Sequence, residues 1–532
     1  MRLMRIPSAA VVTVLSVAGG MALGSQTVRT QDRDQVRARV WSAALAVVEK
    51  EYVDELEASR LVYASIDGML RTLDPHSSFF DPREFAQMRE RQEGRYFGIG
   101  VTITTVDKDV TITSLFEGSP AYKAGMRRGD IIAMVGEEDA HGWSTEDVVK
   151  RVKGPKGTFV QITLRRPGLE KMIPITVERD EINIVTVRTA FMIAPGTGYI
   201  RLQDFSETSD REMGEALTKL KAQGMQRLML DLRENPGGPL DQAIAVANRF
   251  LKKGSMIVST RGRIPNSNEE YRAVTEGGYQ DVPMIVMVNR QSASASEIVS
   301  GAMQDHDRAL IVGERTFGKA LVQSVYPIAN DAGIAVTTGR YYTPSDRMIQ
   351  RPWDGAFDDY LTYSLKDQEE TREHNPADLK YTSGGRKVYG GGGIEPDHFI
   401  LGPVEGFNPT RFARLLVSRG GFIGFAEKFT KEGDQRPGSQ SAAMYKVAPG
   451  WQVTDAMIEE FKKYLTSQGG KIDEAAFKTD LPFIRAMMHY EVDVDLFSVE
   501  EARRNLSKVD PQIQKALGYF DEAKALIAKK TQ

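Results

Sequence analysis

Three serines alternate with two alanines at residues 292–296, and the run Ser-Ala-Ser-Ala-Ser-Glu leads into a segment expected to be helical to about Gln304. A serine at the start of a helix is usually only a cap for the helix backbone. In this chain an apolar strand and a short loop precede the serines, so the positive end of the helix dipole would favour an oxyanion beside them. The segment is a candidate site for an oxygen nucleophile.

A serine hydroxyl needs a base to act as a nucleophile, and the usual partner is histidine. The chain has six histidines, and His306 lies twelve positions after Ser294. That is about 18 Å along a helix, too far for contact. His76 and His141 lie before the core, and the other histidines lie in glycine-rich or carboxyl-terminal segments with no partnering motif. A Ser-His-Asp triad is therefore not favoured, although the sequence leaves it open. Lysine can replace histidine when burial lowers its pKa. Lys319, between Gly318 and Ala320, is the best placed lysine.

Two consecutive glycines form a third candidate loop. The run Asn-Pro-Gly-Gly-Pro at 235–239 follows an apolar segment ending at Leu232 and precedes an expected helix at 243–251. Glycines in that position can direct N–H groups at a developing oxyanion. The alternative is an ordinary turn, in which Pro-Gly-Gly is also common. Together the three loops could supply a nucleophile, a base and oxyanion donors for acyl transfer.

The three loops follow segments that predict buried strands. Apolar runs at 227–232, 284–288 and 309–312 each lie next to a helical segment or a loop. Alternation of this kind predicts a layered α/β domain. The candidate glycines, serine and lysine therefore lie at the ends of its strands.

A β-rich module precedes this domain. Residues 94–180 alternate apolar and polar positions between Gly- and Pro-containing turns, which predicts short strands. The runs Tyr-Phe-Gly-Ile-Gly at 96–100, Gly-Ser-Pro-Ala at 118–121 and Gly-Asp-Ile-Ile at 129–132 resemble the motifs of a PDZ domain.

A glycine-rich loop of that type presents backbone N–H groups to the terminal carboxylate of a peptide, whose backbone pairs with the adjoining strand. The predicted peptide-binding residues are Phe97, Gly98, Ile99 and Gly100, and the expected helix at 144–152 would line the side-chain groove with Val148 and Val149. A module that only packs on its neighbours is the alternative.

Composition excludes several classes of protein. Of 532 residues, 41% are hydrophobic and 27% are charged, which is ordinary for a globular multi-domain chain. The net charge of -3 gives no global basic field for nucleic acid. With no cysteine, the chain has no disulfide, thiolate zinc site or cysteine nucleophile, and without a His-Glu-x-x-His motif it is not a zinc peptidase of that type.

The two ends of the chain differ from the middle. Arg2 and Arg5 precede an apolar stretch at 9–23, which predicts an export signal, either cleaved or retained as a membrane anchor, with a buried helix as the third possibility. Residues 35–63 predict two helices that could pack on the core or on a partner subunit. From about residue 408 the chain is again largely helical and carries no catalytic motif.

Five ordered motifs resemble those of the carboxyl-terminal processing, or tail-specific, serine peptidases, and the resemblance covers residues 35 to 400. The motifs are Leu-Asp-Pro-His-Ser-Ser-Phe-Phe at 73–80, Asp-Leu-Arg-Glu-Asn-Pro-Gly-Gly at 231–238, Ser-Ala-Ser-Ala-Ser-Glu-Ile at 292–298, Gly-Glu-Arg-Thr-Phe-Gly-Lys at 313–319 and Tyr-Gly-Gly-Gly-Gly-Ile-x-Pro-Asp at 389–397.

This resemblance implies a Ser-Lys dyad with Ser294 as nucleophile and Lys319 as base, and Gln323 as the group that orients the lysine. It further implies an oxyanion hole made by the N–H groups of Ala295 and of Gly237 or Gly238. One departure from the family pattern is Ala320, since glycine is usual after the lysine.

The resemblance implies a multi-domain α+β chain whose α/β serine peptidase core is of the crotonase/ClpP type. The expected divisions are a signal peptide or anchor at 1–24, a helical region at 25–92, an inserted PDZ domain at 93–180, the peptidase core at 181–404 and a helical region at 405–532.

The expected function is endoproteolysis of exported proteins or peptides near their carboxyl termini, at the periplasmic or extracytoplasmic face of the cell membrane. The expected partners are free carboxyl termini, with a homo-oligomer or an adaptor left open. No nucleic acid, metal or organic cofactor is expected. The alternative is an inactive PDZ scaffold that binds exported protein tails.

Overall fold

The computed structural model describes residues 35–529, with gaps at 107, 117, 167–168, 354–359, 366–372, 403–408 and 431–446. The expected export segment at 1–24 lies outside the described residues. Across the described ranges, no helix combines the length and the apolar character needed to cross a membrane. The chain forms two compact units, one of residues 1–85 and 324–336 and one of residues 86–323 and 337–532.

The smaller unit contains a helix at 35–51, α2 (Ala58–Leu70) and β1 (Ser78–Phe80). The two helices expected between 35 and 63 are present, and the second continues to Leu70. The turn before β1 is fixed by Asp74, whose carboxylate accepts the N–H groups of His76 and Ser77 and the Ser77 hydroxyl. The 73–80 motif thus ends a helix and begins a strand.

The β-rich module of the larger unit has a five-strand path in the order β3-β4-β5-β7-β8, with β6 paired to β5, and a separate pair of β2 and β9. Its elements are β2 (Arg95–Gly98), β3 (Val101–Val106), β4 (Asp109–Leu115), α4 (Pro120–Lys123), β5 (Ile131–Val135), β6 (Glu138–Asp139), α5 (Thr145–Val152), β7 (Phe159–Arg165), β8 (Ile173–Glu178) and β9 (Asp180–Asn183). The chain enters the module through α3 (Pro82–Glu93), whose first four residues belong to the smaller unit.

The expected groove role of Val148 is wrong. Val148 is 1% exposed and belongs to the apolar core of this module, together with Ile112 and Ile162, whereas Val149 is half-buried. Adjacent positions on a helix point about 100° apart, so only one of the two valines can face the sheet.

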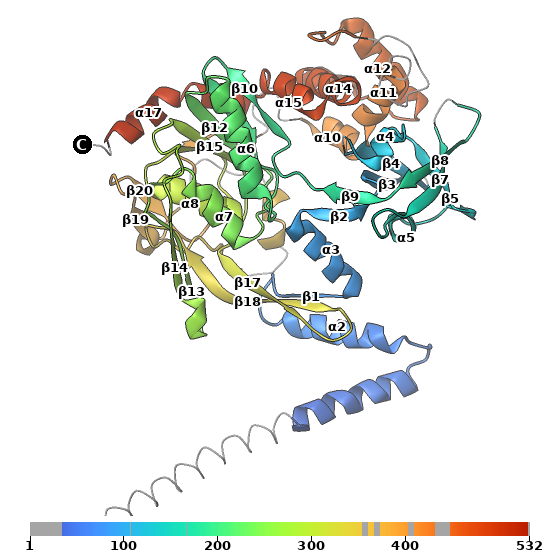
Figure 1. Ribbon diagram of the computed structural model, residues 1–532, viewed down its shortest axis with the longest axis horizontal. Helices are drawn as coiled ribbons and strands as arrows, with labels where there is room; N and C mark the ends of the chain where they lie inside the picture. Colours follow the sequence, from blue (N-terminus) through green and yellow to red (C-terminus); the bar gives the residue numbers. More distant parts are fainter. Residues whose placement is uncertain are drawn as a thin grey trace, which may run out of the picture. The chain divides into compact units, whose positions relative to one another are not determined.

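The larger unit's core sheet has six strands in the order β10-β11-β12-β15-β16-β21, and all pairs after the first are parallel (Figure 1). Parallel neighbours need crossover connections, which contain α6, α7 and α8. The elements are β10 (Thr189–Ala194), β11 (Thr197–Arg201), α6 (Ser209–Ala222), β12 (Arg227–Asp231), α7 (Leu240–Asn248), β15 (Met284–Val288), α8 (Ala295–Asp305), β16 (Leu310–Gly313) and β21 (His398–Phe399).

Alternate residues of the core strands face two helical layers. Leu230 and Val286 lie in the apolar cluster that contains α6, α7 and α8, whereas Met229 and Ile285 lie in the cluster that contains α16 (Pro511–Leu517) and α17 (Phe520–Lys529). Burial on both faces explains why these strands are continuous apolar runs in the sequence. Figure 1 shows the red α17 beside β12 and β15.

Other strands extend from the core. Residues of β13 pair antiparallel with β14 and with the second half of β18. Their bounds are β13 (Met256–Arg261), β14 (Glu269–Arg272), β17 (Leu321–Pro327), β18 (Gly333–Tyr342), β19 (Leu379–Tyr381) and β20 (Lys387–Tyr389).

The carboxyl-terminal helices form two groups. The first has its own apolar core around Phe425, Phe461 and Met488. It consists of α10 (Arg411–Ser418), α11 (Gly421–Thr430), α12 (Asp455–Ser467), α13 (Glu474–Thr479), α14 (Leu481–Leu496) and α15 (Val499–Ser507). The second group, α16 and α17, covers the core sheet, which the division at residue 405 did not anticipate.

Candidate active site

Of the three serines, Ser294 has the unusual backbone. It precedes α8 with a φ of 53° and a ψ of -113°, and its side chain is half-buried. A non-glycine residue with positive φ is strained and is held there by its surroundings. Ser292 and Ser296 are fully buried, and their hydroxyls donate to the carbonyl oxygens of Leu232 (2.7 Å) and Asn235 (3.1 Å). Their roles are structural.

The glycine loop lies directly against Ser294. A Cβ atom on Gly237, whose φ is +99°, would lie 2.8 Å from the Cβ of Ser294 and 2.8 Å from the backbone nitrogen of Ala295. Asn235 holds the loop in place, because its Oδ1 accepts the Gly237 N–H at 2.9 Å and its carbonyl oxygen accepts the Ala293 N–H at 3.0 Å. The fold therefore brings together the glycines and the serine, as expected from the sequence.

Lys319 and Gln323 are also in contact. The Lys319 Nζ donates to Gln323 Oε1 at 2.9 Å, and both side chains are half-buried. The lysine loop follows β16 and packs on the glycine-rich run at 390–393. The Ile394 N–H donates to Thr316 Oγ1 at 2.6 Å, and a Cβ on Gly393 would lie 2.4 Å from the Thr316 carbonyl oxygen. The 389–397 motif thus supports the lysine loop.

A buried carboxylate joins the serine loop to the lysine loop. Glu297 Oε2 accepts the backbone N–H groups of Ser294 (2.8 Å) and Lys319 (2.9 Å). Its Oε1 accepts the Gly318 N–H at 2.7 Å and the Thr316 hydroxyl at 2.5 Å. Burial raises the pKa of Glu297 to about 7, against the opposing effect of these four donors. In its ionised form the carboxylate satisfies all four.

A buried tyrosine contacts the same two residues. The hydroxyl of Tyr341 lies 2.6 Å from the carbonyl oxygen of Lys319 and 3.3 Å from that of Ser294. The residue is 1% exposed, and burial raises the pKa of its phenol well above the ordinary value. The phenol therefore keeps its proton and acts as a donor.

Asp231 and Arg233, in the Asp-Leu-Arg run before the glycines, belong to a buried network of ion pairs. Asp231 is fully buried at the end of β12, where it accepts from Tyr199 Oη at 2.7 Å and from Arg233 Nε at 3.0 Å. Burial alone would raise the pKa of Asp231, but the guanidinium groups of Arg233 and Arg201 hold it well below the usual range. The carboxylate stays ionised and fixes the start of the glycine loop.

The predicted peptide-binding residues lie where β2 ends and β3 begins. Phe97 is 42% exposed, whereas Ile99 is 1% exposed and its side chain lies in the core of the module. The carbonyl oxygen of Ile99 accepts the Ala121 N–H at 2.9 Å. The side chain and the carbonyl oxygen of Ile99 are therefore both engaged within the module.

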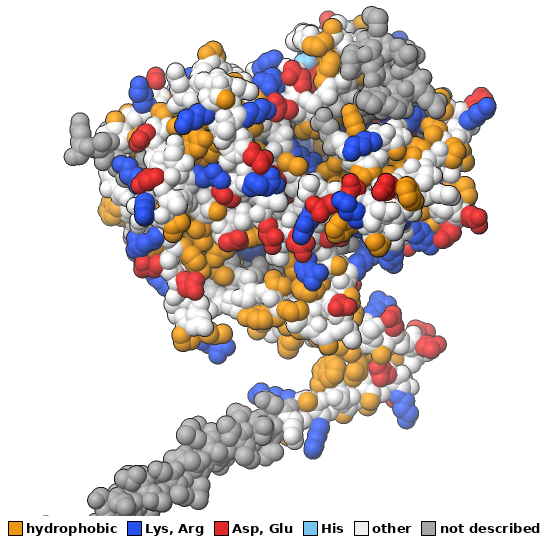
Figure 2. Space-filling model, in the orientation of Figure 1, with side chains coloured by type: hydrophobic (Ala, Val, Ile, Leu, Met, Phe, Trp, Pro, Cys, Tyr) orange, Lys and Arg blue, Asp and Glu red, His pale blue; other side chains and the backbone are white. Residues whose placement is uncertain are grey.

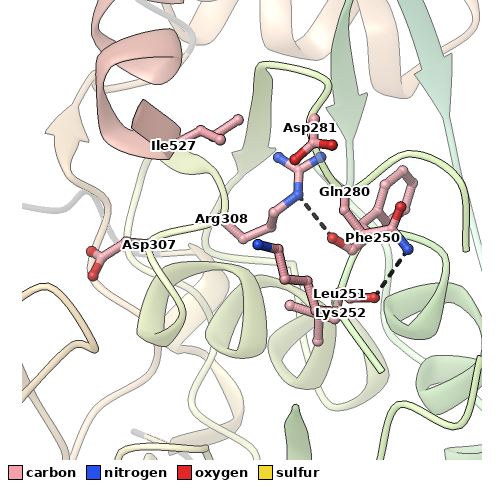
Figure 3. Close-up of a pocket in the computed structure, with 8 residues that line it drawn as sticks. All are labelled: Phe250, Leu251, Lys252, Gln280, Asp281, Asp307, Arg308 and Ile527. Atoms are coloured by element: carbon pink, nitrogen blue, oxygen red, sulfur yellow. Dashed lines mark hydrogen bonds between the residues drawn. The ribbon is translucent and has the colours of Figure 1, made fainter. Parts of the chain in front are cut away.

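A pocket elsewhere in the core does not contain the candidate residues (Figure 3). Its arginine, Arg308, donates to the carbonyl oxygens of Phe250 (2.8 Å) and Val282 (2.8 Å) and joins the segment after α7 to the segment before β15. Burial lowers the pKa of Arg308 to about 10. These contacts assign Arg308 a structural role.

Among the residues that the structure describes, no group of three or more His, Asp or Glu side chains could hold a metal ion.

On the face shown in Figure 2, acidic and basic side chains are interspersed. The His306 Nε2 atom lies 2.6 Å from the carbonyl oxygen of Met256 and is engaged with β13.

Sequence reasoning missed Glu297, Tyr341 and Asn235 as site residues. Glu297 stands three positions after Ser294, the spacing of a capping box, and this signal could have identified it. Asn235 lies inside a recognised motif, but its side-chain contacts depend on the fold. No local pattern marks Tyr341, which comes from a distant strand.

Comparisons with known proteins identify the family to which the chain is related. Residues 196–360 match the model of peptidase family S41, and residues 87–165 match that of the PDZ domain. A carboxy-terminal-processing protease of Bartonella bacilliformis is 38% identical over 307 residues, covering 57% of this chain and 70% of the relative. A carboxyl-terminal-processing protease of Synechocystis sp. is 35% identical over 295 residues, covering 54% of this chain and 68% of the relative.

A solved photosystem II D1 C-terminal processing protease is 31% identical, and the match covers 57% of this chain and 87% of that chain with a TM-score of 0.32. The multi-domain α+β fold with a PDZ domain is confirmed, and the protein is a serine endopeptidase. The chain belongs to peptidase family S41, with the carboxyl-terminal processing proteases.

Proposed function

We propose that the enzyme cleaves proteins or peptides near their carboxyl termini with Ser294 as nucleophile and Lys319 as general base. The observation that carries this proposal is the shared carboxylate of Glu297, which accepts the backbone N–H groups of both residues. Two loops from successive parallel strands are thereby held next to each other. A serine beside a half-buried lysine can form an acyl-enzyme without histidine.

In the proposed reaction the neutral amine of Lys319 takes the Ser294 hydroxyl proton while the serine oxygen attacks the peptide carbonyl. The protonated lysine then gives that proton to the leaving amine, and water hydrolyses the acyl-enzyme. Gln323 orients the lysine through its 2.9 Å contact with Nζ.

The oxyanion that forms during attack would be held by backbone N–H groups. Ala295 is the first residue of α8, where N–H groups lack helical partners. Of the two glycines, Gly237 donates its N–H to Asn235, which favours Gly238 as the second donor.

The PDZ domain would bind the substrate's free carboxylate at residues 97–100 and deliver the tail to the site, because a glycine-rich loop before a strand edge suits a chain terminus. The apolar stretch at 9–23 supports export, as a cleaved signal or as an anchor, and action at the periplasmic or extracytoplasmic face of the membrane. A homo-oligomer or an adaptor remains part of this proposal.

The test compares cleavage of an unfolded protein with an apolar tail by the full chain and by Ser294→Ala and Lys319→Ala. Both substitutions should abolish cleavage and leave tail binding intact. If Lys319→Ala still cuts, another group is the base. If the unaltered chain binds tails and never cuts them, the inactive scaffold is the correct function.

A further inference from the structure

Glu297 and Tyr341 contact the same pair of residues through different backbone groups. Glu297 accepts the N–H groups of Ser294 and Lys319, and Tyr341 faces their carbonyl oxygens. A contact to one loop alone would stabilise the shape of that loop. Contacts to both loops set the distance between them, and this distance decides whether the lysine amine can reach the serine hydroxyl.

The strand that carries Tyr341 is itself hydrogen-bonded to the lysine loop. The Tyr341 backbone N–H donates to the carbonyl oxygen of Ala320 at 3.0 Å. The amide of Ala320 donates to Gln350 Oε1 at 2.8 Å. The phenol has one proton for two carbonyl oxygens, and the shorter contact, to Lys319, receives most of it.

We propose that Tyr341 is a positioning residue for peptide hydrolysis, and that its hydroxyl closes a clamp, opposite Glu297, that fixes the separation of Ser294 and Lys319. This inference rests on the proposed function of that pair. The tyrosine touches neither substrate nor reacting atoms, and its effect passes entirely through the backbone of the two residues.

The experiment compares Tyr341→Phe with Ser507→Ala in the full chain. Ser507, in α15, is a matched control, because its hydroxyl is equally buried and donates at 2.7 Å to a backbone carbonyl oxygen, that of Arg504, outside the active site. The readouts are kcat and KM for a fluorogenic peptide, the rate of labelling by an alkyl fluorophosphonate, which reports serine activation without the substrate tail, and Tm.

Tyr341→Phe should lower kcat and the labelling rate together by about 10- to 100-fold, the range expected for displacement of reacting groups by up to 1 Å. Its KM should stay within about twofold, because loss of an interaction that acts only in the transition state lowers kcat and kcat/KM equally. Ser507→Ala should change Tm little and leave both rates unchanged. The proposal is overturned if Tyr341→Phe keeps both rates within twofold, or if the two variants lose both rates equally.

Should Tyr341→Phe fail to fold, p-aminophenylalanine at position 341 supplies the test, because it keeps an N–H donor at the same place. Near-normal rates support the clamp, and a folded but slow variant contradicts it. Failure of the dyad itself would be seen separately, as continued cleavage by Ser294→Ala or Lys319→Ala.

Discussion

Replacing Gly237 by alanine should inactivate the enzyme without unfolding it. The new Cβ would lie 2.8 Å from the Ala293 carbonyl oxygen, the Ala295 nitrogen and the Ser294 Cβ. Two of these atoms are backbone, and the third belongs to the nucleophile, so none can move without disturbing the site. The glycine loop must therefore shift away from the serine.

The size of the effect follows from this shift. Misplacing a reacting or stabilising group by about 1 Å costs about 100-fold in rate, and losing one oxyanion donor costs about 100- to 1,000-fold. From these two costs we expect kcat to fall at least about 100-fold. KM should change little, because an oxyanion donor acts in the transition state and not on the bound peptide.

Gly254 provides the matched control. Its φ of +86° is close to the +99° of Gly237, but nothing lies within 4 Å of its would-be Cβ. Alanine at either position carries the same backbone cost, about 1–2 kcal/mol, and only Gly237→Ala adds the crowding at Ser294.

The assay is steady-state hydrolysis of a fluorogenic peptide, with Tm measured by scanning fluorimetry. Both variants should lose a few degrees, on the order expected for that cost, and only Gly237→Ala should lose activity. If Gly237→Ala keeps kcat within threefold of Gly254→Ala, the glycine loop does not form the oxyanion site.

Two further predictions concern buried carboxylates. Burial raises the pKa of Glu297 to about 7, so the protonated group stabilises the fold at pH 4, and this stabilisation is lost as the pH rises through 7. Relative to Glu297→Gln, the free energy of unfolding of the unaltered chain should fall by about 3 kcal/mol between pH 4 and pH 7. Denaturant unfolding measures this change. Replacing Arg128 by methionine should lower Tm by several degrees, and more at pH 8 than at pH 5.5, because it leaves Glu491 and Asp495 without their buried cation.

The sequence predicted the parts of the site that depend on local pattern. Strand-loop-helix order placed Ser294 before α8, and the glycines after β12 were recognised as an oxyanion candidate. These features follow from hydrophobic runs, turn residues and motif spacing, all within about 20 residues of one another. The contact between the glycine loop and Ser294 then follows because parallel strands end at one edge of the sheet.

What the sequence could not supply depends on register and on distance along the chain. Tyr341 reaches Ser294 only because β18 pairs with β13 in one register, and a shift of one residue would turn the tyrosine to the other face. The cover of the core sheet by α16 and α17 involves residues more than 200 positions from β15. An amphipathic helix shows that it has an apolar face but not what that face covers.

The contact between the PDZ domain and the carboxyl-terminal helices was unforeseen for the same reason. Arg128, in the turn before β5, donates to Glu491 Oε2 at 2.7 Å and to Asp495 Oδ1 at 3.3 Å. Glu427 of α11 adds a third carboxylate, which packs on Gly129. Burial raises the pKa of Glu427 to about 7, with Asp495 adding to the rise and Arg128 opposing it. One guanidinium thus offsets the charge of several acids.

Without the guanidinium of Arg128 these acids repel one another, and breaking a buried ion pair on one side costs about 3–5 kcal/mol. Burial raises the pKa of Glu427 to about 7, so at pH 5.5 this carboxyl is protonated and adds no charge to the cluster, which is why the loss in Arg128→Met should shrink at pH 5.5. Arg151→Met is the control, because Arg151 pairs with the exposed Glu138 and should change Tm little at either pH. Equal losses at both pH values would show that the Arg128 side chain acts by packing and not by charge.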